Sequence, residues 1–243
     1  MLSLIIPTSC ERDNIESVLQ RVAAVRPSLG EAMEVLVVDS ASADGTAACA
    51  REALDRAQLG RVIEQPSRCS LSQAVLEGIR QARGNLIGVM DADLSHPPEL
   101  LAALVQAVRA GHEVAIASRY VRGGEVCAWS WRRRALSRLG NFLARPLVPV
   151  ADATSGYFVC EAGFVKSLAL DGRGFKLLLE ILVRGRVQRI QEVPYTFMDR
   201  RHGASKLTRR VLWAYLRQVG QLYRVRLTRS NFVSRSVSVG GMG

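Results

Sequence analysis

Short apolar runs alternate with amphipathic helical patterns through the first half of the chain. Each run is bounded by turn residues, and each is followed by a segment whose apolar residues recur every three or four positions. The expected strands are 2–6, 35–38, 62–64, 86–90 and 113–117, and the expected helices are 14–25, 46–56, 71–82 and 98–110. This alternation predicts an α/β fold with a mostly parallel central sheet and helices on both faces.

The second half of the chain has shorter elements and ends in a long basic helix. We expect helices over 129–143, 161–168 and 175–184, and two short strands within 188–197. The last helix, 207–229, places apolar residues at helical spacing with arginines between them. Such a helix either lies in the interface of an anionic bilayer or packs on the domain with its arginines in water. We therefore expect a domain over 1–206, the amphipathic helix 207–229 and a disordered Ser/Gly-rich tail over 230–243.

Composition limits the partners. The 243 residues are 48% hydrophobic, which is ample for a core, and carry a net charge of +11. The excess is concentrated near the C-terminus, because residues 200–243 contain no Asp or Glu. Such a balance predicts an anionic partner, which is nucleic acid, nucleotide phosphate or an anionic membrane surface. The five cysteines show no CxxC spacing, so zinc and redox sites are not supported.

No apolar run reaches the roughly 18–20 residues needed to span a bilayer, and the sequence starts directly with a strand. We therefore expect a cytoplasmic protein that reaches a membrane only from its cytoplasmic face. A separate membrane-anchoring subunit would be compatible with this pattern.

Asp91 and Asp93 follow the strand 86–90 directly. Ligands bind at the carboxyl ends of strands in open α/β sheets, and residues two apart in an extended segment share a face. Two carboxylates there suit one hard cation, Mg²⁺ or Mn²⁺, on a diphosphate. The alternative is a solvated Asp-x-Asp turn that caps the next helix.

Two common nucleotide motifs do not occur. The sequence has neither the GxGxxG of dinucleotide-binding folds nor the GxxxxGK[ST] of P-loops. The strand ends carry acids instead, namely Glu11, Asp39, Asp91 and Asp93. Carboxylates suit metal ions and the hydrogen-bond donors of base and ribose, and do not cradle phosphate directly.

Several segments, taken together, resemble one family. They are Pro7-Thr8 with Glu11 and Asn14-Ile15, Val38-Asp39 with Asp44-Gly45-Thr46, Met90 through Pro98, Ser118-Arg119-Tyr120, Thr154 through Tyr157, and Val193-Pro194 through Phe197, Arg200, Gly203, Ser205 and Lys206. In this order they are similar to the dolichol-phosphate (polyprenol-phosphate) mannosyltransferases, which are inverting family 2 glycosyltransferases with the GT-A fold. The similarity covers about residues 2 to 210.

The resemblance implies transfer of mannose from GDP-mannose to the phosphate of a polyprenyl lipid. By position, the nucleotide sugar contacts Pro7, Thr8, Glu11, Asp39, Asp91 and Ala92, and the metal contacts Asp91 and Asp93. The acceptor phosphate contacts Arg119, Arg133, Ser137 and Arg200, and Lys206 closes over the site. Asp93, Arg119 and Arg200 are the expected catalytic residues.

The chemistry of the acceptor agrees with this set. A phosphomonoester has a second pKa near 6, so it carries a nucleophilic oxygen at neutral pH and needs no strong general base. The site has to supply cations that hold this phosphate near a diphosphate, and a metal that stabilises the leaving group.

The sequence departs from the family pattern at Ser40, where a second acid is usual, at Ser70 and Ser72, where a Gly-Leu-Gly run is usual, and at Phe158, where an arginine is common. Three alternatives stay open. The donor is a UDP-sugar such as UDP-glucose, the chain is a basic nucleic-acid-binding protein, or it is a membrane scaffold with an inactive site. Against the second, the acids cluster at strand ends and no nucleic-acid motif occurs, so no nucleic acid is expected.

Overall fold

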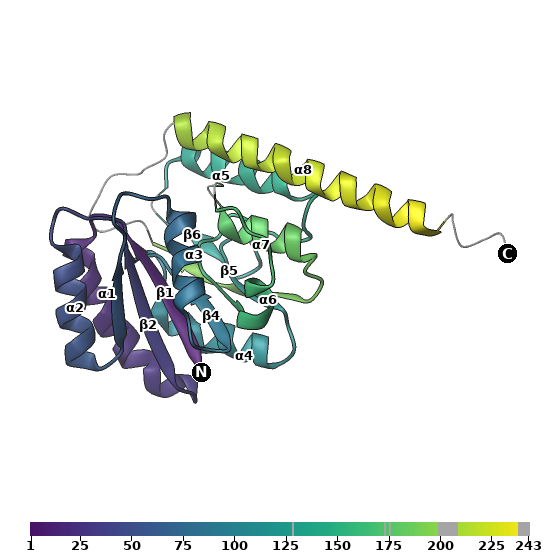
Figure 1. Ribbon diagram of the computed structural model, residues 1–243. Coiled ribbons are helices and arrows are strands. Elements are labelled where there is room, and N and C mark those ends of the chain that lie inside the picture. The colour runs from purple at the N-terminus through teal and green to yellow at the C-terminus, as the bar shows by residue number, and fades with distance from the viewer. Residues whose placement is uncertain (128, 173, 175, 199–208, 238–243) are drawn as a thin grey trace.

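A seven-stranded sheet forms the centre of the molecule in the computed structural model (Figure 1). The structure describes residues 1–127, 129–172, 174, 176–198 and 209–237, with side chains except at 132, 209–211 and 228–237. The strand order is β3-β2-β1-β4-β7-β5-β8, and only β7 runs antiparallel to its neighbours. The strands are β1 Leu2–Thr8, β2 Met33–Asp39, β3 Gly60–Glu64, β4 Leu86–Val89, β5 Val114–Ser118, β7 Phe158–Glu161 and β8 Ile190–Pro194, and a separate parallel pair joins β6 Glu125–Val126 to β9 Thr196–Phe197.

Helices cover both faces of the sheet (Figure 1). The α-helices are α1 Arg12–Val25, α2 Thr46–Ala57, α3 Leu71–Gln81, α4 Leu101–Arg109, α5 Trp131–Ala144, α6 Ala162–Lys166, α7 Leu177–Gly185 and α8 Arg209–Val237, with 3-10 turns at η1 Arg26–Leu29 and η2 Pro98–Leu100. One core layer packs α1, α2 and α4 on the sheet, and the other packs α3, α6 and α7 on it. The predicted mostly parallel α/β architecture is confirmed.

Successive side chains of a strand point to opposite faces of the sheet, so the apolar residues of each strand alternate between the two core layers. In β1, Leu4 and Ile6 belong to the layer under α1 and α2, whereas Ile5 belongs to the layer under α3. All three side chains are fully buried. Because both faces are covered, the strand reads as a continuous apolar run rather than an alternating one.

The carboxyl ends of the parallel strands meet at one edge, and this edge carries the polar residues. β2 ends at Asp39, β4 is followed by Asp91, and β5 is followed by Arg119. Since β7 is antiparallel and lies between β4 and β5, its start brings Gly156 to the same edge. The sheet order therefore gathers residues from four separate segments.

The last helix packs on the domain through one of its sides and leaves the opposite side exposed. Tyr215 Oη donates to Gly140 O of α5 at 2.6 Å, and Tyr223 Oη donates to Leu143 O at 3.0 Å. The Gln218 amide bonds both backbone groups of Lys176, at 2.8 and 3.0 Å. α8 thus lies along α5 (Figure 1). Trp213 of α8 is 73% exposed.

The predicted boundaries at the C-terminus differ from the observed helix. α8 runs to Val237, eight residues past the predicted end at 229 and into the predicted tail. Residues 230–237 contain Ser, Asn and Arg but no Gly or Pro, so nothing in them breaks a helix that has already begun. Residues 238–243 lie outside the described part of the chain.

We predict that Gly78→Ala destabilises the fold. A Cβ at this position of α3 would lie 2.6 Å from Ile5 Cγ2, a stiff side chain on the central strand. The overpacking should outweigh the gain in helix propensity and lower the free energy of unfolding by about 1–2 kcal/mol, measured by urea denaturation. Gly163→Ala is the control, because no atom lies within 4 Å of its added Cβ. Equal stability of the two variants would contradict the close packing of α3 on β1.

Candidate functional site

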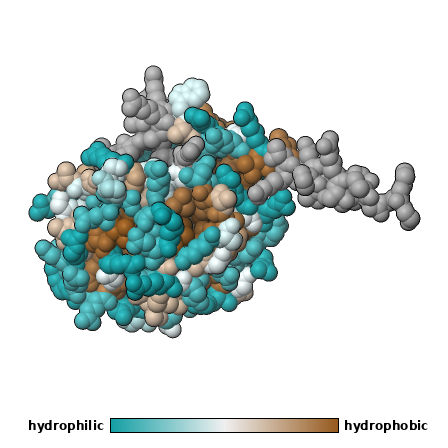
Figure 2. Space-filling model, in the orientation of Figure 1, coloured by the Kyte–Doolittle hydropathy of each residue, from teal (hydrophilic) through white to brown (hydrophobic). Residues whose placement is uncertain are grey.

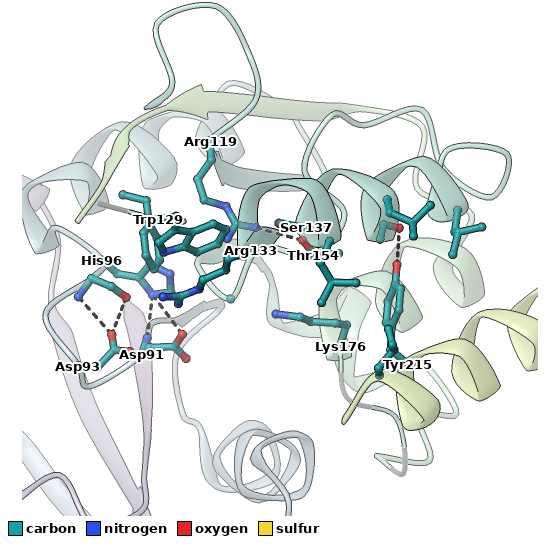
Figure 3. Close-up of a pocket in the computed structure, with 18 of the residues that line it drawn as sticks. Asp91, Asp93, His96, Arg119, Trp129, Arg133, Ser137, Thr154, Lys176 and Tyr215 are labelled. Atoms are coloured by element: carbon teal, nitrogen blue, oxygen red, sulfur yellow. Dashed lines mark hydrogen bonds and ion pairs between the residues drawn. The ribbon is translucent and has the colours of Figure 1, made fainter. Parts of the chain in front are cut away.

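A cavity of about 290 Å³ opens at the carboxyl edge of the sheet and extends under α8 (Figure 3). Its two ends differ in chemistry. One end is lined by the acids Asp91 and Asp93 and by the cations Arg119, Arg133 and Lys176. The other end is apolar, and its walls are Leu136, Leu139 and Leu143 of α5 and Leu212, Tyr215 and Leu216 of α8. The cavity therefore joins a charged site to an apolar passage between two helices.

The two carboxylates are held by the turn that follows β4. Ser95 donates to Asp93 Oδ1 from both its backbone N–H and its hydroxyl. Leu94, which lies between Asp93 and Ser95, has φ +61°, the left-handed conformation that closes this turn. Asp93 is only 4% exposed, whereas the Asp91 side chain is 30% exposed. Both line the cavity, as predicted from their place after the strand.

His96 fixes the backbone of the acidic turn. Its Nδ1 accepts the Asp91 N–H at 3.0 Å, and its ring packs among Tyr157, Tyr195 and Phe197. Burial lowers the pKa of His96 and outweighs the opposite effect of Asp91 and Asp93. The ring is therefore neutral at pH 7, and its 3.7 Å approach to Asp91 Oδ2 is no ion pair.

The acidic pair fits a hard divalent cation. Its donors are carboxylate oxygens, both groups reach the same cavity, and space remains beside them for substrate oxygens. Within the described residues, no group of three or more His, Cys, Asp or Glu could hold a metal. Two carboxylates that share an ion with substrate phosphate are the usual arrangement for Mg²⁺. Asp91 and Asp93 are therefore the residues that would hold Mg²⁺ or Mn²⁺.

Arg119 forms a buried pair with Asp152. Nε and Nη2 each donate to one oxygen of this carboxylate at 2.7 Å, and Nη2 also donates to Thr154 Oγ1 at 3.0 Å. Burial alone would lower the pKa of Arg119, but the Asp152 charge raises it well above its usual value. Arg119 is thus a fixed cation, and most of its donors are already used.

Two further side chains from α5 complete the charged end. The Arg133 guanidinium lies 4.2 Å from the centre of the Trp129 ring, in a cation–π contact. Ser137 Oγ accepts a hydrogen bond from Tyr120 Oη at 2.7 Å, so its own proton is available to an anion in the cavity. Arg133 and Ser137 therefore both face the cavity from one side of the helix, as their spacing of four residues predicts.

The residues expected to hold the nucleoside lie outside this cavity, at the ends of β1 and β2. Asp39 is buried, and it accepts from Thr8 Oγ1 at 2.8 Å and from the N–H and hydroxyl of Ser42. Glu11 accepts from Asn14 Nδ2 at 2.9 Å. Pro7 is the neighbour of Thr8 in β1, and Ala92 is buried between the two acids. These five residues and the acidic pair lie at or just beyond the carboxyl ends of three adjacent strands. Of these residues, only the acidic pair lines the cavity.

Two predicted residues, Arg200 and Lys206, lie outside the described part of the chain. Two others were missed by the sequence interpretation. Lys176 lines the cavity, and Asp152 pairs with Arg119. Asp152 begins the polar run before β7, which is a weak signal, while Lys176 precedes an apolar helix and has no distinctive pattern around it.

The departures from the family pattern have structural partners. Ser40 Oγ bonds both backbone groups of Cys69, at 2.8 and 3.1 Å. Ser70 caps α3, and the Ser72 hydroxyl donates to Gly174 O at 2.7 Å. Phe158 is buried in β7. These serines therefore hold loops that border the site, and the phenylalanine belongs to the core.

Comparison with known proteins now identifies the family. Residues 3–168 match the family described as glycosyl transferase family 2. The chain is 37% identical over 225 residues to the dolichol-phosphate mannosyltransferase of Pyrococcus furiosus, covering 91% of this chain and 63% of that protein. It is also 37% identical over 217 residues to the polyprenol monophosphomannose synthase of Mycolicibacterium smegmatis, covering 84% and 80% of the two chains. The chain belongs to glycosyltransferase family 2, and within it to the dolichol-phosphate mannosyltransferases.

Solved structures confirm the GT-A fold of this glycosyltransferase. The glucosyl-3-phosphoglycerate synthase of Mycobacterium tuberculosis, in complex with Mn²⁺, UDP-glucose and glycerol 3-phosphate, superposes with a TM-score of 0.68. The match covers 93% of this chain and 79% of that one at 20% identity, which supports the fold alone. This chain spans about two thirds of the length of the Pyrococcus relative, at 63%. Within the described residues, no helix is long and apolar enough to cross a membrane.

We predict that Gly156→Ala weakens metal binding. The added Cβ would lie 3.0 Å from Asp91 Oδ2 and 3.3 Å from His96 Cε1, so the carboxylate has to move. Displacing a ligand in this way should lower the affinity for Mn²⁺ about tenfold, measured by electron paramagnetic resonance of free Mn²⁺ in the presence of GDP. Gly163→Ala again serves as the control. Unchanged affinity in Gly156→Ala would contradict Asp91 as a ligand fixed by this contact.

Proposed function

We propose that this glycosyltransferase moves mannose from GDP-mannose to a polyprenyl phosphate, giving polyprenyl-phosphate mannose with inversion at the sugar. The observation that carries the proposal is the two-ended cavity. Its charged end suits a diphosphate and an acceptor phosphate, and its apolar end, between α5 and α8, suits an isoprenoid chain. The Pyrococcus and Mycolicibacterium relatives bear names of enzymes for dolichol- and polyprenol-linked mannose, which supports the same substrates.

The donor side of the site rests on the acidic pair. Asp91 and Asp93 would hold Mg²⁺ or Mn²⁺ against the diphosphate, and the ion would neutralise the charge that develops on the leaving GDP. Ser95 holds the Asp93 carboxylate, and His96 holds the backbone N–H of Asp91, so the acidic turn is formed before substrate binds. The Mn²⁺ and UDP-glucose bound by the Mycobacterium structure support a divalent ion in this fold.

The acceptor side consists of cations and one hydroxyl. Arg119, Arg133 and Lys176 all line the charged end. Arg133 and Lys176 would offset the repulsion between the acceptor phosphate and the diphosphate, whereas Arg119, whose charge Asp152 balances, would donate a directed hydrogen bond. Ser137 would donate its free proton to the same phosphate. With the phosphate held there, one of its oxygens attacks the anomeric carbon on the face opposite to GDP, which gives inversion. The two expected contacts Arg200 and Lys206 belong to the same proposal.

The choice of donor base is the finer part of the proposal. Asp39 and Glu11 would accept hydrogen bonds from the nucleoside, since a carboxylate accepts from donors such as the N–H groups of a base and the hydroxyls of a ribose. A UDP-sugar is the alternative donor, since the Mycobacterium structure holds UDP-glucose in the same fold.

We predict that Asp93→Ala abolishes transfer and that chelation of divalent ions does the same. The assay follows radiolabelled lipid formed from GDP-mannose or UDP-glucose and a short polyprenyl phosphate, with Mg²⁺, with Mn²⁺ or with chelator. Activity should fall at least a thousandfold in the variant, because the charge on the leaving diphosphate loses its counterion. Asp55→Ala, an exposed carboxylate of α2, should keep full activity. Near-normal transfer by Asp93→Ala would contradict the metal assignment. Lipid product from UDP-glucose but not from GDP-mannose would show that the donor is a UDP-sugar.

We also propose that α5 and α8 together rest on an anionic membrane at its cytoplasmic face. Seven of the ten large exposed apolar side chains in the described part of the chain belong to these two helices, namely Trp131, Leu139, Phe142, Leu212, Trp213, Leu216 and Leu227. The helices contain four and seven arginines, respectively, and no Asp or Glu. Figure 2 shows apolar surface among hydrophilic side chains along the upper edge, where these helices lie. This combination suits the interface of an anionic bilayer.

We predict that Trp131→Ser combined with Trp213→Ser reduces membrane binding about tenfold or more. Both indoles are over 70% exposed, so their loss removes interfacial area and leaves the core intact. Sedimentation with vesicles of phosphatidylglycerol and phosphatidylcholine, compared with phosphatidylcholine alone, measures the effect. Leu71→Ser, at an exposed apolar residue of α3, should bind like the unchanged protein. If the unchanged chain sediments with neither vesicle type, the two helices do not bind a bilayer on their own, and membrane binding would require an anchoring subunit.

A further inference from the structure

Asp152 is a carboxylate with several hydrogen bonds near the cavity, yet it does not line it. It is completely buried in the segment before β7. Its oxygens accept Arg119 Nε and Nη2 at 2.7 Å each and the Arg119 backbone N–H at 3.1 Å. The side chain and the backbone of one residue are therefore fixed by the same carboxylate.

The surroundings hold Asp152 in turn. Glu192 of β8 accepts the backbone N–H of Asp152 at 3.1 Å and that of Ala151 at 2.8 Å. From α5, Asn141 Nδ2 approaches Asp152 Oδ1 at 3.5 Å, and Asn141 Oδ1 accepts the Thr154 N–H at 3.2 Å. The carboxylate is thus anchored to a strand and to the helix that carries Arg133 and Ser137.

The geometry leaves one part of Arg119 for a ligand. Nε and Nη2 are occupied by Asp152 and Thr154, and no described residue accepts a hydrogen bond from Nη1. The guanidinium is also packed against the rings of Tyr120, Trp129 and Phe197, with 5.4 to 5.6 Å to their centres. Since Arg119 lines the cavity, Nη1 is the part of its guanidinium that remains for a ligand there.

We propose that Asp152 is a positioning residue for the acceptor, because it holds Arg119 so that Nη1 donates to the acceptor phosphate. This inference rests on the proposed function. A guanidinium fixed in advance loses no rotamer freedom when the phosphate arrives, and its bond to an anion is charge-assisted. Asp152 itself touches no substrate and acts through Arg119.

A purely structural ion pair is the competing explanation. It would stabilise the fold, and its loss would lower the amount of folded enzyme without changing the affinity of the folded fraction for acceptor. The two explanations therefore differ in the acceptor KM, which is independent of enzyme concentration.

The test is Asp152→Asn, which keeps the shape of the side chain. The amide directs an N–H₂ group at one of the Arg119 donors, so the guanidinium can no longer lie flat against it. We expect the KM for farnesyl phosphate to rise about 10- to 100-fold, the range of one hydrogen bond to a charged group, while the KM for GDP-mannose changes less than twofold. Glu180→Gln is the matched control, since it removes a buried, Arg184-paired carboxylate of α7 that does not line the cavity.

A double-mutant cycle sharpens the test. If Asp152 acts through Arg119, then Asp152→Asn should have no further effect on acceptor KM once Arg119→Ala is present. Additive effects of the two substitutions would overturn the inference. So would an acceptor KM of Asp152→Asn within twofold of the unchanged enzyme, with folding verified by circular dichroism.

A spectroscopic measurement separates this inference from the proposed function. In the unchanged protein the Nε–H proton of Arg119 should exchange slowly with water in nuclear magnetic resonance spectra, and its signal should shift with farnesyl phosphate. Asp152→Asn should lose both properties. A slowly exchanging signal that farnesyl phosphate leaves unmoved, in an enzyme that forms mannolipid, overturns the inference alone. Absence of mannolipid from the unchanged enzyme with either cation overturns the proposed function itself.

Discussion

The antiparallel strand β7 is the constraint on which the rest of the site depends. It pairs with β4 on one side and with β5 on the other, so it separates two strands that would otherwise be neighbours. Its start then has to enter at the carboxyl edge, between the acidic turn and Arg119. Gly156 lies against Asp91 because no side chain is there, and Asp152 reaches Arg119 from the same segment. One reversed strand thus joins the donor and acceptor sides.

Charge is distributed so that the site stays balanced before any substrate binds. Burial would raise the pKa of Asp152, but the adjacent Arg119 charge and hydrogen bonds hold it below its usual value. The two charges of the pair cancel, so it adds no net charge to the site. Its role in recognition is to fix the orientation of the Arg119 guanidinium. Arg133 and Lys176 supply positive charge at the end of the cavity that also holds the negative pair Asp91 and Asp93 (Figure 3). Two phosphate-bearing substrates can enter such a site with partners of the appropriate sign.

Local sequence patterns predicted the parts of the site that depend on local structure. Asp91 and Asp93 could be located because an apolar strand precedes them. Arg133 and Ser137 came from the family resemblance, and their four-residue spacing then predicted that they share one face of a helix. Asp152 could not be found in this way, since its partner is 33 residues away in the chain and only the strand order brings them together. The sequence left the packing of α8 on the domain as one of two alternatives, and its contacts could not be predicted, because they include the Gln218 amide bonding the backbone of Lys176. Propensity and periodicity carry no information on such long-range pairs.

The helix α5 meets the site on one side and solvent on another. Arg133, Ser137 and Asn141 follow one another at four-residue spacing on one side; Arg133 and Ser137 line the cavity, and Asn141, further along, bonds the Asp152 segment. Phe142 is 65% exposed. A helix is rigid over this length, so contacts on its outer face and contacts in the cavity cannot be adjusted independently. If the outer face rests on a bilayer, then the apolar passage between α5 and α8 opens where an isoprenoid chain would leave the lipid. The same rigid body would then set the depth of the membrane contact and the position of the phosphate-binding residues.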